Sequence, residues 1–135
     1  MPIQVVAEQN IMVGKSTVIS AAVPKGTYTA VFEDDGETGY FYALDASVKD
    51  QAIRDALHVY DVESVTDKTT LATVRIGWSL DNAKAVLLIN DYPHAVFDFQ
   101  ARRGYCRTGF PPPAPDNQWS AEGHEWDEAC IALFE

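Results

Sequence analysis

Two histidines and two aspartates in the second half of the sequence are the residues best suited to metal-dependent chemistry. They form two closely spaced pairs, His94 with Asp98 and His124 with Asp127. Two imidazoles and a carboxylate around a metal ion with an open position could activate a water molecule for hydrolysis. Their spacing matches no recurrent metal motif. We therefore predict no metal and no cofactor, and we keep as an alternative a small hydrolase or metal-dependent enzyme that uses His94, Asp98, Arg107 and His124.

Cys106, which precedes Arg107, is a second candidate for chemistry. A cation beside a thiol stabilises the reactive thiolate, and His94 or His124 could act as its base. Strand alternation, however, directs the Cys106 side chain toward the core, which favours a buried and unreactive thiol. Cys106 and Cys130 lack the spacing of a zinc site, so we expect both to be free thiols in a reducing compartment.

Residues 14–17, GKST, resemble the end of a phosphate-binding loop. The complete motif needs a glycine where this chain has Gln9, and it opens a helix after a buried strand. Residues 16–22, STVISAA, instead have the composition of an extended segment that leads to Pro24. We therefore predict no nucleotide site here.

Alternating apolar residues predict several strands. Residues 27–32 and 40–44 flank a segment rich in turn formers, and they predict a β-hairpin with an acidic loop at 33–37. Residues 73–80 alternate strictly. Residues 83–90 are apolar almost throughout, as in a strand that is covered on both faces or lies centrally in a sheet.

Two further strands are expected at 94–99, HAVFDF, and at 105–110, YCRTGF. The apolar side of the second strand consists of Cys106, Thr108 and Phe110. Because side chains alternate along a strand, the polar sides of the two strands would lie on one face. That face would carry His94, Asp98, Tyr105 and Arg107. We expect Asp98 and Arg107 to pair across the two strands.

Two helices are expected to pack on the sheet. Ser47 and Asp50 match a capping box, after which apolar residues recur at helical spacing over 48–58. A second helix is predicted over 124–134, where acidic residues occupy the first turn and an apolar stripe begins at Trp126.

The segment 110–126 is unusually rich in aromatic residues and prolines. The PPPAP run at 111–115 must be extended, because proline fixes φ and restricts the residue before it. Trp119 and Trp126 are expected to anchor the segment on a sheet face through their large buried area. We therefore interpret this segment first as a structural staple, second as a docking surface and third as an active site.

The acidic composition limits the classes of partner. The 135 residues carry a formal charge of −10, from twenty acidic and ten basic side chains. Phosphate contacts need clustered Lys and Arg, so we expect no nucleic-acid partner, whereas a basic protein partner is compatible with this charge. The sequence shows neither a signal-peptide pattern nor an apolar run long enough to span a membrane, which predicts a cytoplasmic protein without membrane contact.

Three segments carry a resemblance to a known family, namely VFEDDGETGYFYALD, LLINDYPHAVFDFQARRGYCRTGFPPP and WSAEGHEWDEA. They resemble a small bacterial family catalogued as domain of unknown function 2251, and the resemblance extends over about residues 10–134. The family brings no established activity, cofactor or catalytic residue. The resemblance implies a bacterial cytosolic setting and assigns no role to any residue.

Together these patterns predict a single α+β domain over residues 1–135, with a mainly antiparallel sheet of about five to seven strands and two packed helices. We expect a non-enzymatic acidic binding module, immunity-like or regulatory, for a basic protein partner. Another alternative is a pocket for a small anionic ligand, in which Arg107 would hold the anion. Its lining would be Tyr40, Tyr42, Trp78, Trp119 and Trp126. The candidate binding residues are His94, Asp98, Tyr105, Arg107, Trp119, His124 and Trp126.

Overall fold

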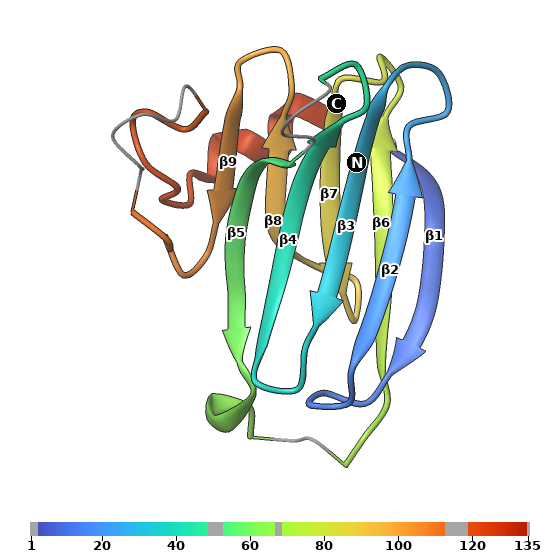
Figure 1. Ribbon diagram of the computed structural model, residues 1–135, viewed down its shortest axis with the longest axis vertical. Coiled ribbons are helices and arrows are strands. Elements are labelled where there is room, and N and C mark those ends of the chain that lie inside the picture. Colours follow the sequence, from blue (N-terminus) through green and yellow to red (C-terminus); the bar gives the residue numbers. More distant parts are fainter. Residues whose placement is uncertain (1–2, 49–52, 67–68, 113–118, 135) are drawn as a thin grey trace.

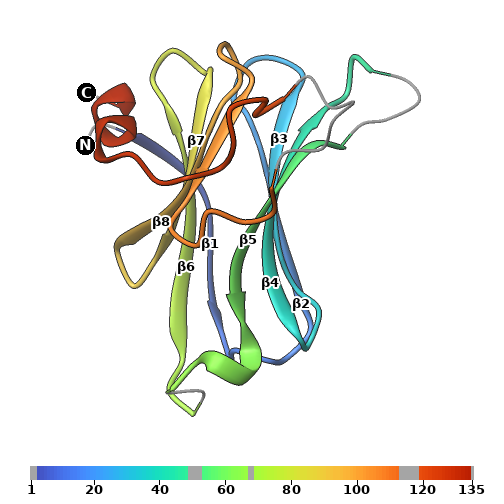
Figure 2. The same ribbon diagram turned by 90° about the vertical axis from the view of Figure 1, so that its left-hand side faces the viewer.

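The chain folds as a β-sandwich in a computed structural model that describes residues 3–48, 53–66, 69–112 and 119–134. Two antiparallel sheets face one another as two layers (Figure 1, Figure 2). Sheet A has the strand order β1-β6-β7-β8-β9, and sheet B has the order β2-β3-β4-β5.

The elements have the following bounds. Sheet A contains β1 (Ile3–Ile11), β6 (Ala72–Ser79), β7 (Lys84–Ile89), β8 (Tyr92–Asp98) and β9 (Arg103–Cys106). Sheet B contains β2 (Thr17–Ala22), β3 (Tyr28–Asp34), β4 (Thr38–Asp45) and β5 (Ile53–Asp61). Two 3-10 helices complete the fold, η1 (Val62–Ser64) and η2 (Glu128–Phe134).

This architecture corrects the predicted α+β class. The described residues contain nine strands in two sheets, two short 3-10 helices and no α-helix. The protein is therefore almost entirely β, and two sheets packed face to face replace the single sheet with two packed helices that was expected.

The helix predicted over 48–58 is wrong, because Ile53–Asp61 forms β5 at one edge of sheet B. Asp55 and Leu57 are buried, whereas the residues between and beside them are partly exposed, which is the two-residue repeat of a strand. In so short a segment the apolar residues fit a helical repeat and a strand repeat equally well. Hydrogen-bonded pairing with β4 makes the segment a strand. The capping residue Asp50 lies outside the described residues.

At the C-terminal end, η2 replaces the α-helix predicted over 124–134. His124 and Glu125 are extended, because they pair with β9. The Cys106 N–H donates to the His124 carbonyl oxygen at 2.9 Å, and Glu125 forms an isolated parallel bridge with Cys106. A helix can begin only after this backbone pairing ends.

Most of the strands expected from alternation are confirmed. β3 and β4 form the predicted hairpin, although Asp34 stays within β3 and the turn is shorter than expected. β6, β7 and β8 follow the predicted segments and pair in order. The strand predicted over 105–110 is wrong in its bounds, because β9 spans Arg103–Cys106 and pairs with β8 only there. β2 confirms that the GKST segment leads into a strand. The sequence analysis missed β1, in which Val5 and Val6 are both exposed.

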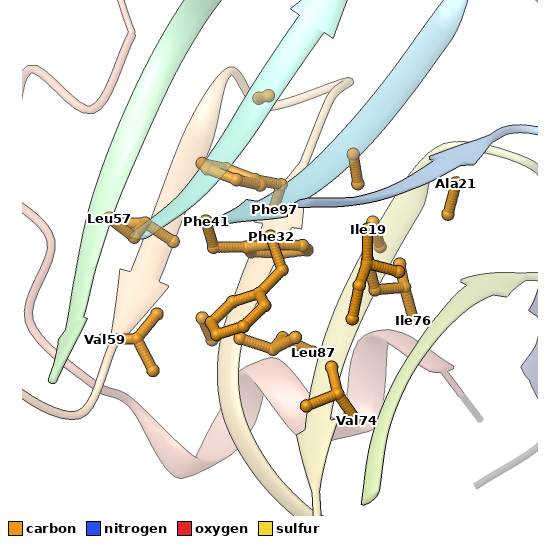
Figure 3. Close-up of a cluster of buried hydrophobic side chains, with 14 of the residues drawn as sticks. Ile19, Ala21, Phe32, Phe41, Leu57, Val59, Val74, Ile76, Leu87 and Phe97 are labelled. Atoms are coloured by element: carbon orange, nitrogen blue, oxygen red, sulfur yellow. The ribbon is translucent and has the colours of Figure 1, made fainter. Parts of the chain in front are cut away.

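The main core lies between the two sheets (Figure 3). Phe32 and Phe41 from sheet B are fully buried, as are Phe97 and Trp78 from sheet A. The Trp78 indole N–H donates to the Ala21 carbonyl oxygen at 3.1 Å, so the polar atom of this ring is satisfied inside the core. The core therefore joins the two layers through aromatic side chains from both.

A second apolar cluster lies on the outer face of sheet A. There η2 places Cys130 and Phe134 against Val86 and Val96 of β7 and β8. β7 lies in the middle of its sheet and has both faces covered, which explains its almost continuous apolar sequence. No helix within the described ranges is long and apolar enough to cross a membrane.

Candidate functional site

Arg107 fastens the C-terminal segment to sheet A. Its guanidinium lies 4.4 Å from the Tyr92 ring centroid and 4.0 Å from that of Trp126. The Nε–H donates to the Pro93 carbonyl oxygen at 2.8 Å, and the Glu128 carboxylate lies 3.3 Å from the other end of the guanidinium. Trp126 is half-buried and the Arg107 guanidinium is stacked between two rings. This cluster therefore holds the C-terminal segment against sheet A, which is the structural role expected for the segment.

The expected pair between Asp98 and Arg107 is wrong. Asp98 lies opposite Arg103 in the register of β8 and β9, and its carboxylate accepts the backbone N–H groups of Gln100 and Ala101, both at 3.1 Å. Asp98 therefore stabilises the turn between the two strands, a common use of aspartate.

His94 and Tyr105 do share the outer face of sheet A with Arg107, as expected. His94 packs edge-on against Tyr92, and burial together with the Arg107 charge lowers the pKa of His94. Tyr105 packs on the outer apolar cluster, with the Arg103 guanidinium 4.7 Å from its ring centroid. These residues form a packed face on the outside of sheet A.

His124 is separated from this group and lies in a buried polar network with Asp55 of β5. The His124 Nε2 atom is 2.9 Å from the Asp55 Oδ1 atom, and its Nδ1 atom is 2.5 Å from the Pro111 carbonyl oxygen. Ser120 Oγ donates to Asp55 Oδ2 at 2.5 Å and accepts the Gly104 N–H at 2.8 Å. The network joins the C-terminal segment to both sheets.

Both ring nitrogens of His124 face oxygen atoms, a carboxylate of Asp55 and the carbonyl of Pro111, and this arrangement favours the doubly protonated imidazolium. Burial alone would lower the pKa of His124, but the hydrogen bond and charge of Asp55 outweigh burial and raise it. Because both His124 ring nitrogens are engaged by oxygen atoms, the candidate metal set of His94, Asp98, His124 and Asp127 does not come together as a metal site. Within the described ranges, no group of three or more His, Cys, Asp or Glu residues is placed to hold a metal ion.

The aromatic residues expected to line one pocket lie in three places. Trp78 and Trp119 are buried in the core, and Trp126 lies on the outer face of sheet A. Tyr40 and Tyr42 stack on each other at the outer face of sheet B, with ring centroids 5.8 Å apart. The structure therefore does not form the aromatic pocket predicted for Tyr40, Tyr42, Trp78, Trp119 and Trp126.

Cys106 and Cys130 are buried free thiols on opposite faces of sheet A. Burial raises the pKa of the Cys106 thiol. Burial, with the nearby acids Asp127 and Glu128, raises the pKa of Cys130 to about 12. Neither thiol is activated as a nucleophile, since nucleophilic cysteines need a lowered pKa.

An apolar hollow lies beside the end of β5. An apolar groove of about 360 Å³ runs between this strand end and the segment that follows β9. Its lining includes Val59, Tyr60, Val65 and Phe110. Phe110 was predicted to face the core but is 58% exposed. β9 ends at Cys106, so the strand alternation of inward and outward side chains does not extend to Phe110.

The groove wall is fixed by the backbone of His58. The His58 N–H donates to the Phe110 carbonyl oxygen at 2.8 Å. The His58 carbonyl oxygen accepts the Thr108 hydroxyl at 2.5 Å and the Cys106 thiol at 3.0 Å. The two sides of the groove are therefore held together by hydrogen bonds, which keep the hollow formed in the unbound protein.

An acidic cleft of about 590 Å³ lies next to the groove and shares the lining residues Asp61 and Ser64 with it. Glu37 from the β3–β4 turn and Glu63 from η1 also contribute to its lining. The Val62 N–H donates to the Glu37 carbonyl oxygen at 2.9 Å, which holds η1 against the turn. The sequence analysis identified the acidic loop but not the groove next to it.

Buried Asp34 organises this end of the sandwich. Its carboxylate accepts the N–H groups of Gly14 and Gly36, both at 2.8 Å, and the Tyr60 hydroxyl at 2.7 Å. The Tyr60 ring lies over Gly39, where an added Cβ would be 2.6 Å from a ring atom, so only glycine fits under the ring. Asp34 and Gly39 thus fix the aromatic floor of the groove.

The chain belongs to the bacterial family described as "Uncharacterized protein conserved in bacteria (DUF2251)", whose model matches residues 11–135. It is similar to a protein of Haemophilus influenzae named "Uncharacterized protein", with 46% identity over 95 residues. That match covers 70% of this chain and 59% of the relative, so the chain spans somewhat more than half of the relative's length. No solved structure matches the chain. The family expected from the sequence is confirmed.

Proposed function

We propose that this protein is a non-enzymatic binding module, immunity-like or regulatory, that docks a basic protein partner beside β5. The observation that carries the proposal is an apolar groove and an acidic cleft that lie side by side and share the lining residues Asp61 and Ser64. A partner segment with an apolar side chain flanked by Lys or Arg would complement both parts. The two buried free thiols support a cytoplasmic location as part of this proposal.

The apolar part offers an anchor position. Phe110 exposes 58% of its surface beside Val59 and Val65, and large rings at the centre of an interface often carry much of the binding energy. The groove is preformed, so a partner would lose less conformational freedom on binding.

The acidic part supplies charge complementarity. Neither Glu37 nor Glu63 forms an ion pair with another described residue, whereas Glu8 and Asp91 on sheet A are both paired with Arg75. Unpaired exposed carboxylates steer a basic partner toward its site and do not have to give up a cation on binding. The groove end is therefore a better docking site than the paired acids of sheet A.

A peptide that alternates lysine and leucine serves as a probe for this site. We expect fluorescence anisotropy to detect binding that weakens about threefold to tenfold in E37Q/E63Q, because two exposed ion pairs are lost. F110S should also weaken binding, because it removes the apolar wall. A peptide with glutamate in place of lysine should not bind.

The matched control is E8Q/D91N, which removes the same two charges from the outer face of sheet A. Affinity for the lysine peptide should stay within about twofold of wild type in this variant, since the groove is intact. Equal weakening in the two double variants would mean that only net charge matters, and this result would contradict a docking site at the groove.

A further inference from the structure

β2 is an edge strand whose outer side has no strand paired with it. In the described part of the chain it pairs with β3 alone, at one end of the order β2-β3-β4-β5 (Figure 1). An edge strand carries a row of N–H and C=O groups that another strand can bind. Folded proteins therefore protect such edges, and the four edges of this sandwich differ in how far they are protected.

The other three edges carry recognisable protection. β1 has a register shift after Val5 and carries the charged Glu8. β9 is covered by the C-terminal segment, to which the Cys106 N–H donates a hydrogen bond. β5 has two register shifts against β4, and its His58 N–H donates to the Phe110 carbonyl oxygen in the segment after β9. Bulges, charges and covering segments all hinder the pairing of a further strand.

Within the described residues, β2 has none of these forms of protection. Its six residues, TVISAA, include no charge and no proline, and they pair with β3 without a register shift. Val18 is 60% exposed, and Ser20 and Ala22 are also exposed, whereas Ile19 and Ala21 are buried. A regular, uncharged edge of this kind is a template for an additional strand.

Alternate residues of β2 direct their backbone groups away from β3. The Val23 N–H donates to the Tyr28 carbonyl oxygen at 2.9 Å, so the backbone of Val23, directly after β2, faces β3. Because backbone groups alternate along a strand, Val18, Ser20 and Ala22 direct their N–H and C=O groups to the open side. The edge therefore offers three donors and three acceptors to an incoming strand.

Charge at the two ends of β2 selects the kind of strand that fits. Lys15 precedes β2 and Lys25 follows it. Both are exposed, and neither forms an ion pair with another described residue. A second copy of this chain, paired antiparallel, would bring Lys15 of one copy toward Lys25 of the other, and like charges repel. Acidic side chains at the ends of an incoming strand would instead complement both lysines.

We propose that the β2 edge, Thr17–Ala22 with Lys15 and Lys25, binds an extended segment of a protein partner by strand addition. The segment has an uncharged core of β-branched residues and an acidic side chain at each end. Its backbone extends sheet B by a fifth strand, and its side chains alternate between the side of Val18 and the side of Ile19. This edge lies across sheet B from β5, so the interaction is separate from the docking site at the groove.

The probe is a synthetic peptide with a core of six alternating valine and threonine residues, the length of β2, and two glutamates at each end. N-methyl groups on one edge keep it from stacking with itself. We expect saturable NMR shifts and slowed hydrogen exchange at the amides of Val18, Ser20 and Ala22. The same peptide methylated on both edges, or with lysine in place of glutamate, should bind at least about tenfold more weakly, because backbone bonds or ion pairs are lost.

S20P tests the backbone of the edge directly. This substitution removes an N–H that points away from β3, so the pairing inside sheet B is kept, and edge strands tolerate proline at such positions. S20P should weaken binding of the glutamate peptide at least about tenfold, whereas S20A keeps the N–H and should stay within about twofold of wild type. A22P removes the next outward N–H and repeats the test. S20P should still bind the lysine and leucine peptide at the groove, so the two sites are tested separately.

K15Q/K25Q tests the charges and should weaken binding about threefold to tenfold. R75Q/K84Q, which removes two basic charges that are paired on sheet A, should leave the affinity unchanged. The proposal is overturned by equal binding of the peptide methylated on both edges, by an unchanged affinity in folded S20P and A22P proteins, or by the absence of saturable shifts at the β2 amides. A wild-type dimer that S20P converts to a monomer would assign the edge to a second copy and would also overturn it.

Discussion

At the scale of single residues, His124 and Asp55 form an ion pair in which both side chains are only 3% exposed. Taking two charges out of water is costly, and the cost is offset here because further hydrogen bonds satisfy the remaining polar atoms. Removing one partner would leave the other as a buried and uncompensated charge. The stability of the C-terminal segment therefore depends on two residues that lie far apart in the sequence.

The first prediction concerns this ion pair. H124Q should lower the free energy of unfolding by about 3–5 kcal/mol, because Asp55 is left as an unpaired buried carboxylate. Urea denaturation measures the change. E122Q, which removes an exposed partner of Arg103, is the control and should cost less than about 1 kcal/mol. Similar small losses in both variants would mean that the buried pair does not hold the segment in place.

The second prediction is a pH dependence of stability with a defined sign. The pKa of His124 is raised in the folded protein, so the folded state binds this proton more tightly than the unfolded chain does. The stabilisation is complete below the unfolded pKa of about 6.5 and is lost as the pH rises through the folded pKa. The Asp55 charge raises this pKa, and the nearby Arg103 charge acts in the opposite direction.

His94 provides the contrast within the same chain, because burial lowers its pKa. The contribution of neutral His94 to folding stability is lost as the pH falls from its unfolded pKa of about 6.5 through its lowered pKa in the folded protein. The urea concentration at the unfolding midpoint should therefore be highest near pH ~6.5 and decrease at both lower and higher pH. H124Q should remove the decline on the alkaline side and H94Q the decline on the acidic side. An alkaline decline that persists unchanged in H124Q would contradict the assignment.

At the scale of elements, Arg107 determines how firmly η2 is held to sheet A. The third prediction is that R107A costs about 1–2 kcal/mol, because a guanidinium stacked between Tyr92 and Trp126 is lost. Hydrogen exchange should accelerate at the Cys130 amide, which bonds to Asp127, while β3 amides stay protected. R75A removes an exposed arginine of sheet A and should leave exchange in η2 unchanged. Equal acceleration in η2 and β3 would instead show a global loss of stability.

Much of sheet A was predictable because its sequence signals are local. Val74, Ile76 and Trp78 alternate with polar or small residues, and β7 is apolar throughout because both its faces are covered. The hairpin of β3 and β4 was predictable for the same reason. β5 was not, because its few apolar positions fit a helical repeat equally well and only the pairing with β4 resolves the ambiguity.

The functional candidates were less predictable, since they depend on contacts across the chain. His124 was recognised as a potentially important residue, but its partner Asp55 is 69 positions away and lies on a strand that was predicted to be a helix. The exposure of Phe110 depends on where β9 ends, which single-sequence alternation does not determine. The acidic loop was identified, whereas the groove beside it depends on how the segment after β9 packs against the end of β5.

At the scale of the whole molecule, β5 connects the proposed docking site to the C-terminal segment. The acidic cleft and the groove lie where β5 ends. β5 is anchored in the core by Leu57 and tied to the C-terminal segment through Asp55. The proposed docking site therefore lies on an element that the core and a buried polar network hold in place.

The most direct test of the proposed docking function is a bacterial-lysate pull-down with wild type, E37Q/E63Q and E8Q/D91N at low and high salt. We predict a partner that is retained at low salt by wild type and E8Q/D91N, released at high salt, and not retained by E37Q/E63Q, because exposed charge pairs are screened by salt. A partner retained equally by all three proteins, or at both salt concentrations, would contradict a charge-guided docking site at the groove.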